Sequence, residues 1–201
     1  MATLLMPVVA CGADAGDADV LGCGEGPLVV GRPLRIATTV APITSIVSSI
    51  AWAGGAEVVG VVPEGQDSHT FEPAPSTAAT LSDADVVFLN GLSLEAPTRQ
   101  LALANLGDGG EICELGTTVL PEAEYIYDFS FPEAGGVPNP HLWTNPPMAR
   151  RYAEVVLDVL VARDPEHADA YVPAFDEFEA RVDALDRALR TATATVPRER
   201  R

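Results

Sequence analysis

The sequence predicts an α/β domain in which a parallel sheet of about four strands is flanked by helices. Four short apolar segments recur along residues 34–115, and segments of helical period separate them. This alternation of strand and helix is typical of a parallel sheet. The third segment, residues 85–90, is apolar almost without interruption, which indicates a strand that is covered on both faces.

Strands are expected at residues 34–40, 57–62, 85–90 and 111–115. The helix after the first strand has Pro42 at a first helical position and ends at Gly54-Gly55, which are typical start and stop signals. Ser76 is expected to cap a short second helix, and a third helix covers residues 94–106. In such sheets ligands bind beyond the carboxyl ends of the strands.

The C-terminal third is expected to be mainly helical. Residues 116–140 have no regular period, but their aromatic residues alternate, which predicts an edge strand or hairpin packed over the ligand site. A helix then covers residues 148–163. Asp164 is expected to cap a final helix with Pro165 in its first turn. Continued to Thr195, this helix would be about 45 Å long, which is more than one small lobe needs.

The composition limits the classes of function. The 201 residues are 47% hydrophobic and 20% charged, which is typical of a globular chain of one medium domain or slightly more. No apolar run reaches the roughly 18 residues that span a bilayer. The net charge of −17 argues against nucleic-acid binding, because phosphates would repel the chain.

The three cysteines are expected to have two separate roles. Cys11 follows the short apolar run at residues 4–10, which resembles the end of a bacterial lipoprotein signal; a frayed apolar N-terminus is the alternative. The basic residues expected before such a run are missing, which suggests that the run belongs to a longer signal. Residues 12–33, rich in Gly, Asp and Ala, are predicted to be a flexible tether. With Cys11 lipidated, Cys23 and Cys113 would remain as an even pair that could form a disulfide in an oxidising exterior.

Two histidines lie on loops that prolines bracket and aromatic residues flank. His69 lies between Pro63 and Pro73, after the second strand, and His141 directly follows Pro140. Imidazole nitrogen is a common zinc ligand, and a rigid loop lowers the ordering cost of binding. The paired pattern favours metal ligation, although a single such histidine is more often structural. His167, in the first turn of the final helix, is expected to be solvated and not a ligand.

Three stretches resemble motifs of the solute-binding proteins of bacterial zinc and manganese ABC importers, and they occur in the family's order. They are Asp67-x-His69-Thr70-Phe71-Glu72-Pro73, Asn90-Gly91-Leu92-x-Leu94-Glu95 and Asn139-Pro140-His141-x-Trp143. The resemblance runs from about residue 33 to the C-terminus.

This resemblance implies a lipid-anchored extracytoplasmic receptor that captures Zn²⁺ or Mn²⁺ and delivers it to a membrane permease, without catalysing a reaction. His69 and His141 would be the metal ligands, and the receptor is expected to be a monomer. The implied organisation is a signal remnant (1–11), a tether (12–33), a metal-binding lobe (34–163) and a truncated inter-lobe helix (164–201). A second lobe, carrying the other two ligands, would be absent.

Three further residues are candidates for supporting the ligands. Glu72 is either an acceptor for the second N–H of a histidine ring or an exposed loop carboxylate. Phe71 and Trp143 are expected to shield the site from water, and Asp67 is expected to be a turn residue.

Two other functions are alternatives to this interpretation. A zinc-dependent hydrolase would use a histidine-bound ion to activate water, but the sequence has no HExxH motif, no third histidine on a comparable loop and no glycine-rich phosphate loop. A cell-surface adhesin lipoprotein is the third possibility, which neither repeats nor an exposed aromatic patch supports.

Overall fold

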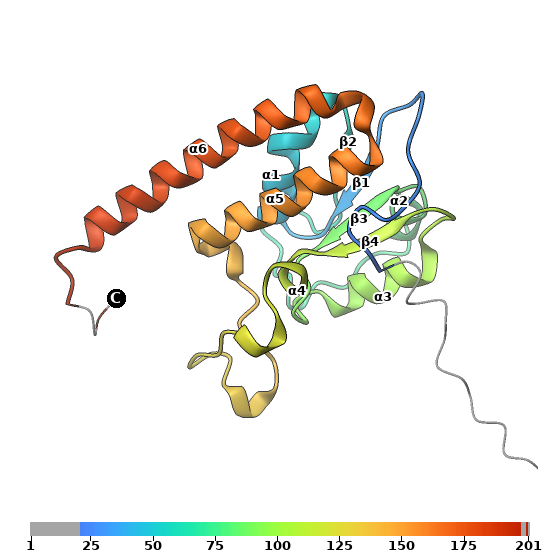
Figure 1. The fold of residues 1–201 in the computed structure, drawn as a ribbon. Helices are drawn as coiled ribbons and strands as arrows, with labels where there is room; N and C mark the ends of the chain where they lie inside the picture. The colour runs from blue at the N-terminus through green and yellow to red at the C-terminus, as the bar shows by residue number, and fades with distance from the viewer. Residues whose placement is uncertain (1–20, 198–199, 201) are drawn as a thin grey trace, which may run out of the picture.

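The computed structural model describes residues 21–197 and Arg200, and it confirms the predicted α/β fold. Four parallel strands form one sheet in the order β2-β1-β3-β4. They are β1 (Arg35–Thr38), β2 (Glu57–Gly60), β3 (Val86–Leu89) and β4 (Glu111–Glu114). Because the strands are parallel, the loops that leave their carboxyl ends meet along one edge of the sheet (Figure 1).

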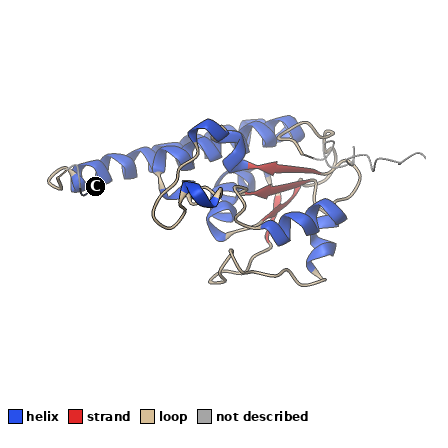
Figure 2. Ribbon diagram, turned by 90° about the horizontal axis from the view of Figure 1, so that it is seen from below, coloured by secondary structure: helices blue, strands red, loops and turns tan. Residues whose placement is uncertain are grey.

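Helices cover both faces of the sheet (Figure 2). On one face lie α1 (Ala41–Ala51), α5 (Pro146–Arg163) and α6 (Ala168–Thr193), which share a core with Val86 and Phe88. On the other face lie α2 (Thr77–Ser82) and α3 (Ala96–Asn105), which share a second core with Val87 and Leu89. Neighbouring residues of β3 therefore point into different cores, which explains why this strand is apolar throughout.

The segment between β4 and α5 differs from the prediction. No edge strand or hairpin forms there. Instead, a short helix α4 (Leu115–Val119) is followed by single 3₁₀ turns at Glu122–Glu124, Glu133–Gly135 and Leu142–Thr144. Prolines at positions 121, 132, 138 and 140 lack the N–H that a strand ladder needs. The resulting loop projects from the body of the molecule (Figure 1).

Two predicted helix caps are also wrong. Ser76 has helical backbone angles and makes no side-chain cap hydrogen bond to α2. The Asp164 carboxylate likewise caps no backbone N–H, because it accepts hydrogen bonds from the Tyr171 hydroxyl at 2.6 Å and from Nδ1 of His167 at 2.8 Å. A 3₁₀ turn at Pro165–His167 precedes α6.

The N-terminal segment does not behave as the predicted tether over residues 21–33. Leu21 forms a parallel bridge with Ile112 on the outer edge of β4. Cys23 forms a disulfide with Cys113 at a Cα–Cα distance of 4.8 Å, and Val29 is buried in the core. Residues 1–20, including Cys11 and the predicted signal remnant, lie outside the described residues.

A buried ion pair fixes the same segment. Oε2 of Glu111 accepts the backbone N–H groups of residues 24, 25 and 26 at 2.9–3.2 Å, and its Oε1 accepts Nη1 of Arg163 at 2.6 Å. Arg163 also donates to the carbonyl groups of Pro27 at 2.7 Å and Gly109 at 3.0 Å. We call Glu111, Arg163 and residues 24–27 the N-terminal clasp. It joins β4, the end of α5 and the N-terminal segment.

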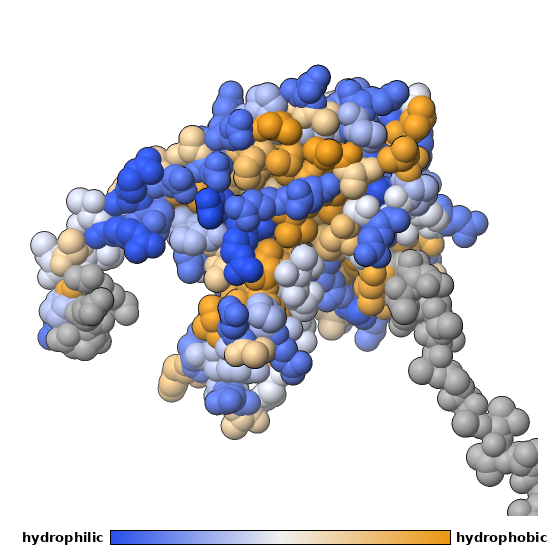
Figure 3. All heavy atoms as spheres, in the orientation of Figure 1, coloured by the Kyte–Doolittle hydropathy of each residue, from blue (hydrophilic) through white to orange (hydrophobic). Residues whose placement is uncertain are grey.

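Helix α6 extends beyond the body of the lobe (Figure 1). Its 26 residues correspond to about 39 Å, somewhat less than predicted. Within this helix only Tyr171 is buried, and Leu185 and Leu189 near its far end are exposed. In Figure 3, apolar residues gather where α5 and α6 meet the body, whereas the far part of α6 is mainly hydrophilic. Among the described helices, none is long and apolar enough to cross a membrane.

Candidate metal-binding site

The fold brings the two predicted ligand histidines together at the carboxyl edge of the sheet. His69 lies on the loop that follows β2, and His141 lies just before α5. Their Nε2 atoms are 3.3 Å apart, although 72 positions separate the residues in the sequence. This proximity depends on tertiary structure, because the two loops leave different elements of the fold.

The separation of the two nitrogens suits a shared metal ion. A zinc ion lies about 2.0–2.1 Å from each imidazole nitrogen that binds it. With Nε2 atoms 3.3 Å apart, an ion at that distance from both would subtend an N–metal–N angle of roughly 105°, close to the tetrahedral value of about 109°. The pair therefore has the geometry of two adjacent ligands without any rearrangement of the loops.

His141 is half-buried and held on its far side by Asn139. Oδ1 of Asn139 accepts the backbone N–H of His141 at 2.9 Å and bonds to its Nδ1 at 2.8 Å. Nδ2 of Asn139 donates to the Asp128 carboxylate at 2.6 Å. The side chain of Asn139 thus takes the supporting position for which the sequence had suggested Glu72, which is exposed.

The environment of His141 favours its neutral, metal-binding form. Burial lowers its pKa below the ordinary value of 6.5, and the nearby His69 lowers it further, against a smaller opposing effect of Asp128. The side-chain hydrogen bond from Asn139 lowers the pKa of Asp128, with help from the backbone N–H of Phe131. These hydrogen bonds therefore favour the ionised form of Asp128, which is the form that accepts them.

His69 is more exposed and is positioned by its own turn. The Asp67 side chain accepts the backbone N–H of His69 at 3.0 Å, so Asp67 is the turn residue that was predicted. His167, the histidine not expected to bind metal, is bonded to Asp164 at the start of α6.

Aromatic rings enclose the histidine pair on two sides. Trp143 meets His141 edge-on with ring centroids 5.3 Å apart. Phe131 contacts both imidazoles, with centroid distances of 6.1 Å to His69 and 5.5 Å to His141. Phe71, in contrast, packs between the two cores of the lobe and supports the loop rather than the rings.

Two residues at the site, Asn139 and Asp128, had no role in the sequence-based prediction, and Phe131 was expected only as one of the alternating aromatic residues packed over the ligand site. Asn139 lies inside a quoted motif, two residues before the histidine, and this spacing could have indicated a local side-chain bond. Asp128 and Phe131 reach the site only through the fold of the projecting loop. No short sequence pattern marks Asp128, whereas the alternation of aromatic residues in this segment was the signal for Phe131.

A buried polar network supports the His141 loop from below. Asn90, at the end of β3, donates from Nδ2 to the carbonyl of Pro140 at 3.0 Å and accepts the Tyr152 hydroxyl at 2.8 Å. Its backbone N–H donates to Oε1 of Glu95 at 2.6 Å, and the Thr39 hydroxyl donates to the same oxygen. The motif residues Asn90 and Glu95 are therefore scaffold residues that place the loop on the sheet.

The chain between these two motif residues is tightly turned. Gly91, Leu92 and Ser93 all have positive φ, at 77°, 54° and 63°. Such angles are uncommon for residues other than glycine and cost of order 1–3 kcal/mol each. The turn brings Glu95 back under the end of β3, where burial raises its pKa against the opposing hydrogen bonds from Thr39 and Asn90.

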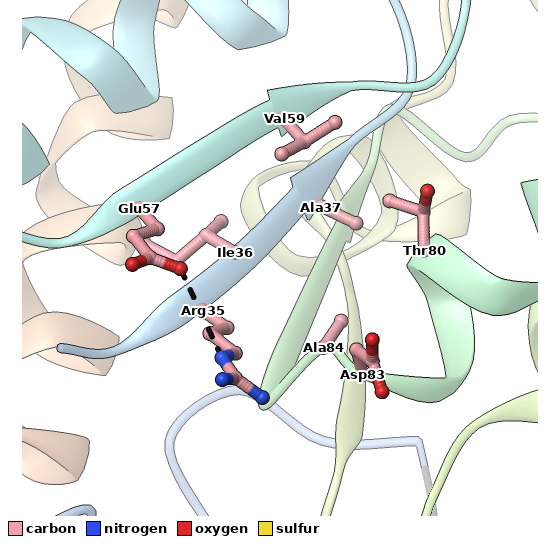
Figure 4. A pocket seen from close by; sticks show the side chains of 8 residues that line it. All are labelled: Arg35, Ile36, Ala37, Glu57, Val59, Thr80, Asp83 and Ala84. Atoms are coloured by element: carbon pink, nitrogen blue, oxygen red, sulfur yellow. Dashed lines mark ion pairs between the residues drawn. The ribbon is translucent and has the colours of Figure 1, made fainter. Parts of the chain in front are cut away.

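The described residues supply two strong donors and no more at this site. No group of three or more His, Cys, Asp or Glu side chains suited to a metal occurs in the part of the chain that the structure describes. A hollow of about 290 Å³ lies elsewhere, toward the amino ends of β1 and β2, where Arg35 and Glu57 pair across its rim at 3.8 Å (Figure 4). It is remote from the histidines.

The parallel sheet and the paired imidazoles at its carboxyl edge define the class of protein to which the chain belongs. It is an α/β lobe with a candidate metal site, as in metal-binding solute receptors. The chain belongs to the family described as zinc-uptake complex component A, periplasmic, whose model matches residues 36–201. The resemblance drawn from the three motifs is thus confirmed.

Individual relatives agree with this assignment. The chain is 30% identical over 200 residues to the manganese-binding lipoprotein MntA of Halalkalibacterium halodurans, covering 98% of this chain and 60% of that protein. It is 28% identical to the iron-binding protein YfeA of Yersinia pestis, covering 88% of this chain and 54% of that protein. The chain therefore spans little more than half the length of these relatives.

A solved structure shows the same fold. The periplasmic zinc binding protein TroA of Treponema pallidum matches with a TM-score of 0.72 at 22% identity, covering 85% of this chain and 58% of that one. The names of the three proteins mention manganese, iron and zinc respectively, so the likeness selects no single ion.

Proposed function

We propose that this chain forms the metal-capturing lobe of an extracytoplasmic solute-binding component of an ABC importer. His69 and His141 would bind one Zn²⁺ or Mn²⁺ ion through their Nε2 atoms, and the ion would be passed to a membrane permease. Cys11 would carry the lipid that anchors the protein. The ion is cargo, so the function requires no chemical step by the protein.

The observation that carries the proposal is the 3.3 Å separation of the two Nε2 atoms. Two features support a binding role over a structural one. His69 is exposed, so it is not a core histidine, and the lowered pKa of His141 keeps its ring neutral near pH 7. Neutral imidazole is the form that binds metal.

Calorimetric titration of the 201-residue chain with Zn²⁺, and separately with Mn²⁺, tests the proposal. We expect one ion per chain, and we expect His69→Ala and His141→Ala each to weaken binding at least tenfold, or about 1.4 kcal/mol. The reason is that each variant removes one of the two protein donors.

His167→Ala is the matched control, because its ring bonds to Asp164 and lies away from the pair. Its affinity should equal that of the wild type. Unchanged affinity in His69→Ala would refute the proposed ligand, and a large loss in His167→Ala would place the ion elsewhere.

A further inference from the structure

The hydrogen bonds behind His141 determine which of its ring nitrogens carries the proton. A carboxylate only accepts hydrogen bonds, so the atom of Asn139 that lies 2.6 Å from Asp128 must be its NH₂ group. Oδ1 of Asn139 then faces His141 and accepts from both the backbone N–H and Nδ1. In the neutral ring, a proton on Nδ1 leaves the lone pair on Nε2.

Asp128 is itself fixed by a turn. Its Oδ1 accepts the backbone N–H groups of Ser130 at 2.8 Å and Phe131 at 3.0 Å, and its own N–H donates to the Phe131 carbonyl at 2.9 Å. Oδ2 is thereby left to face Asn139. The backbone N–H of Asn139 also donates to the carbonyl of Ile126 at 2.7 Å, which links the two stretches of the projecting loop a second time.

We propose that Asp128 and Asn139 are positioning residues for metal binding: they hold His141 as the Nδ1–H tautomer, with the Nε2 lone pair directed toward Nε2 of His69. The inference rests on the proposed function, in which both Nε2 atoms are donors. The Nε2–H tautomer would place a proton where the ion must bind, so a ring free to adopt it binds more weakly.

An exchange of the two side chains provides a specific test. In Asn139→Asp, two carboxylates face each other. In Asp128→Asn, the amide oxygen still accepts the backbone N–H groups of the turn. The NH₂ group at position 128 then faces the NH₂ group of Asn139, so two donors oppose each other. In the double variant D128N/N139D, the new amide at 128 donates to the new carboxylate at 139, which still accepts from His141. Each single change should therefore disrupt the arrangement, and the pair of changes should restore it.

The first readout is the tautomer of His141 in the metal-free protein, measured by long-range ¹H–¹⁵N correlation. We expect Nδ1–H in the wild type and in the double variant, and loss of that state in Asn139→Ala. His167, bonded through its own Nδ1 to Asp164, is the internal control and should keep one tautomer in every variant. Thermal unfolding of each variant confirms that the lobe still folds.

The second readout is zinc affinity. Residues that orient a ligand histidine typically contribute about 10- to 100-fold to metal affinity, so Asn139→Ala should lose that much and the double variant should recover most of what each single change loses. An Nε2–H tautomer of His141 in the wild type would overturn the inference. The inference would also fail if Asn139→Ala changed neither the tautomer of His141 nor the zinc affinity. A wild-type protein with the expected tautomer that binds neither ion would instead refute the proposed function.

Discussion

At the scale of single residues, Glu95 is a buried carboxyl group with an oxygen that the described residues leave unsatisfied. It is 3% exposed, its Oε1 accepts two hydrogen bonds, and its Oε2 has no hydrogen-bond partner among the described residues. Such a buried oxygen favours the protonated acid, because burial penalises the charge. The pKa of Glu95 is raised above its ordinary value of 4.5, with burial as the largest cause.

This raised pKa predicts how Glu95→Gln changes the dependence of stability on pH. Between pH 4.5 and the raised pKa, the folded protein keeps a proton that the unfolded chain has lost. The Glu95 contribution to the free energy of unfolding is therefore greatest below pH 4.5 and falls as pH rises through the folded pKa. The stability of the wild type relative to Glu95→Gln should fall over that window and then level off, as measured by urea unfolding at a series of pH values.

Glu177→Gln, on the exposed surface of α6, is the matched control. Its curve should run parallel to that of the wild type across the same range. A constant difference between the wild type and Glu95→Gln at all pH values would contradict the prediction.

At the scale of elements, the sequence predicted well what local pattern determines. The strands β1 to β4 and the helices α1 and α5 have apolar periods bounded by Pro or Gly, and they form where those signals lie. The loops of His69 and His141 follow from the same signals. Ser76 and Asp164 resemble helix caps equally well, but neither side chain caps a helix. Asp164 accepts from Tyr171 on α6 instead, and nothing among the described residues explains the outcome at Ser76.

Tertiary contacts also explain the elements that the sequence did not predict. Residues 21–33 look like a tether because they are rich in small and polar residues, yet Glu111 and Arg163 hold them through backbone groups. Backbone N–H and carbonyl groups are present in every sequence, so nothing in the segment marks them as bonded. Asp128 was unpredictable for a similar reason, because its partner Asn139 lies beyond a 3₁₀ turn of the same projecting loop and only the fold of that loop brings the two together.

The N-terminal clasp predicts a large effect of Arg163→Met. Both charged side chains are almost fully buried, at 1% and 4% exposure, and Arg163 also donates to the carbonyls of Pro27 and Gly109. Removing one partner of such a pair costs about 3–5 kcal/mol, since the other charge remains buried. Urea unfolding should show this loss, and adding Glu111→Gln should recover part of it.

Arg190→Met provides the comparison, because Arg190 pairs with Asp186 on the exposed surface of α6. It should leave unfolding unchanged, as isolated surface pairs contribute little. Equal effects of the two substitutions would show that the clasp adds no more than a surface ion pair.

At the scale of the whole molecule, the candidate metal site and the N-terminal attachment, which consists of the disulfide and the clasp, lie on separate parts of the lobe. The histidines depend on loops after β2 and before α5, whereas Cys23 is bonded to Cys113 within β4. The disulfide and the clasp fix the chain from residue 21 onward. If Cys11 carries lipid as proposed, only residues 12–20 would separate the anchor from this attachment.

This arrangement leads to a prediction for reduction of the disulfide. Cys23 and Cys113 are 90 positions apart, so the cross-link closes a long loop and restricts the unfolded chain strongly. Reduction should lower the free energy of unfolding by about 2–5 kcal/mol. Residues 21–33 should nevertheless stay protected from hydrogen exchange, because the clasp remains, and zinc affinity should not change. Urea unfolding with and without a phosphine reductant measures the change in stability.

The protein for this experiment carries Cys11→Ser, which prevents disulfide exchange with Cys11. The same protein with Cys23→Ser and Cys113→Ala added has no disulfide and is the control that the reductant should not affect. Equal stability of the oxidised and reduced forms would contradict the prediction, and loss of zinc binding on reduction would show that the attachment and the site are coupled.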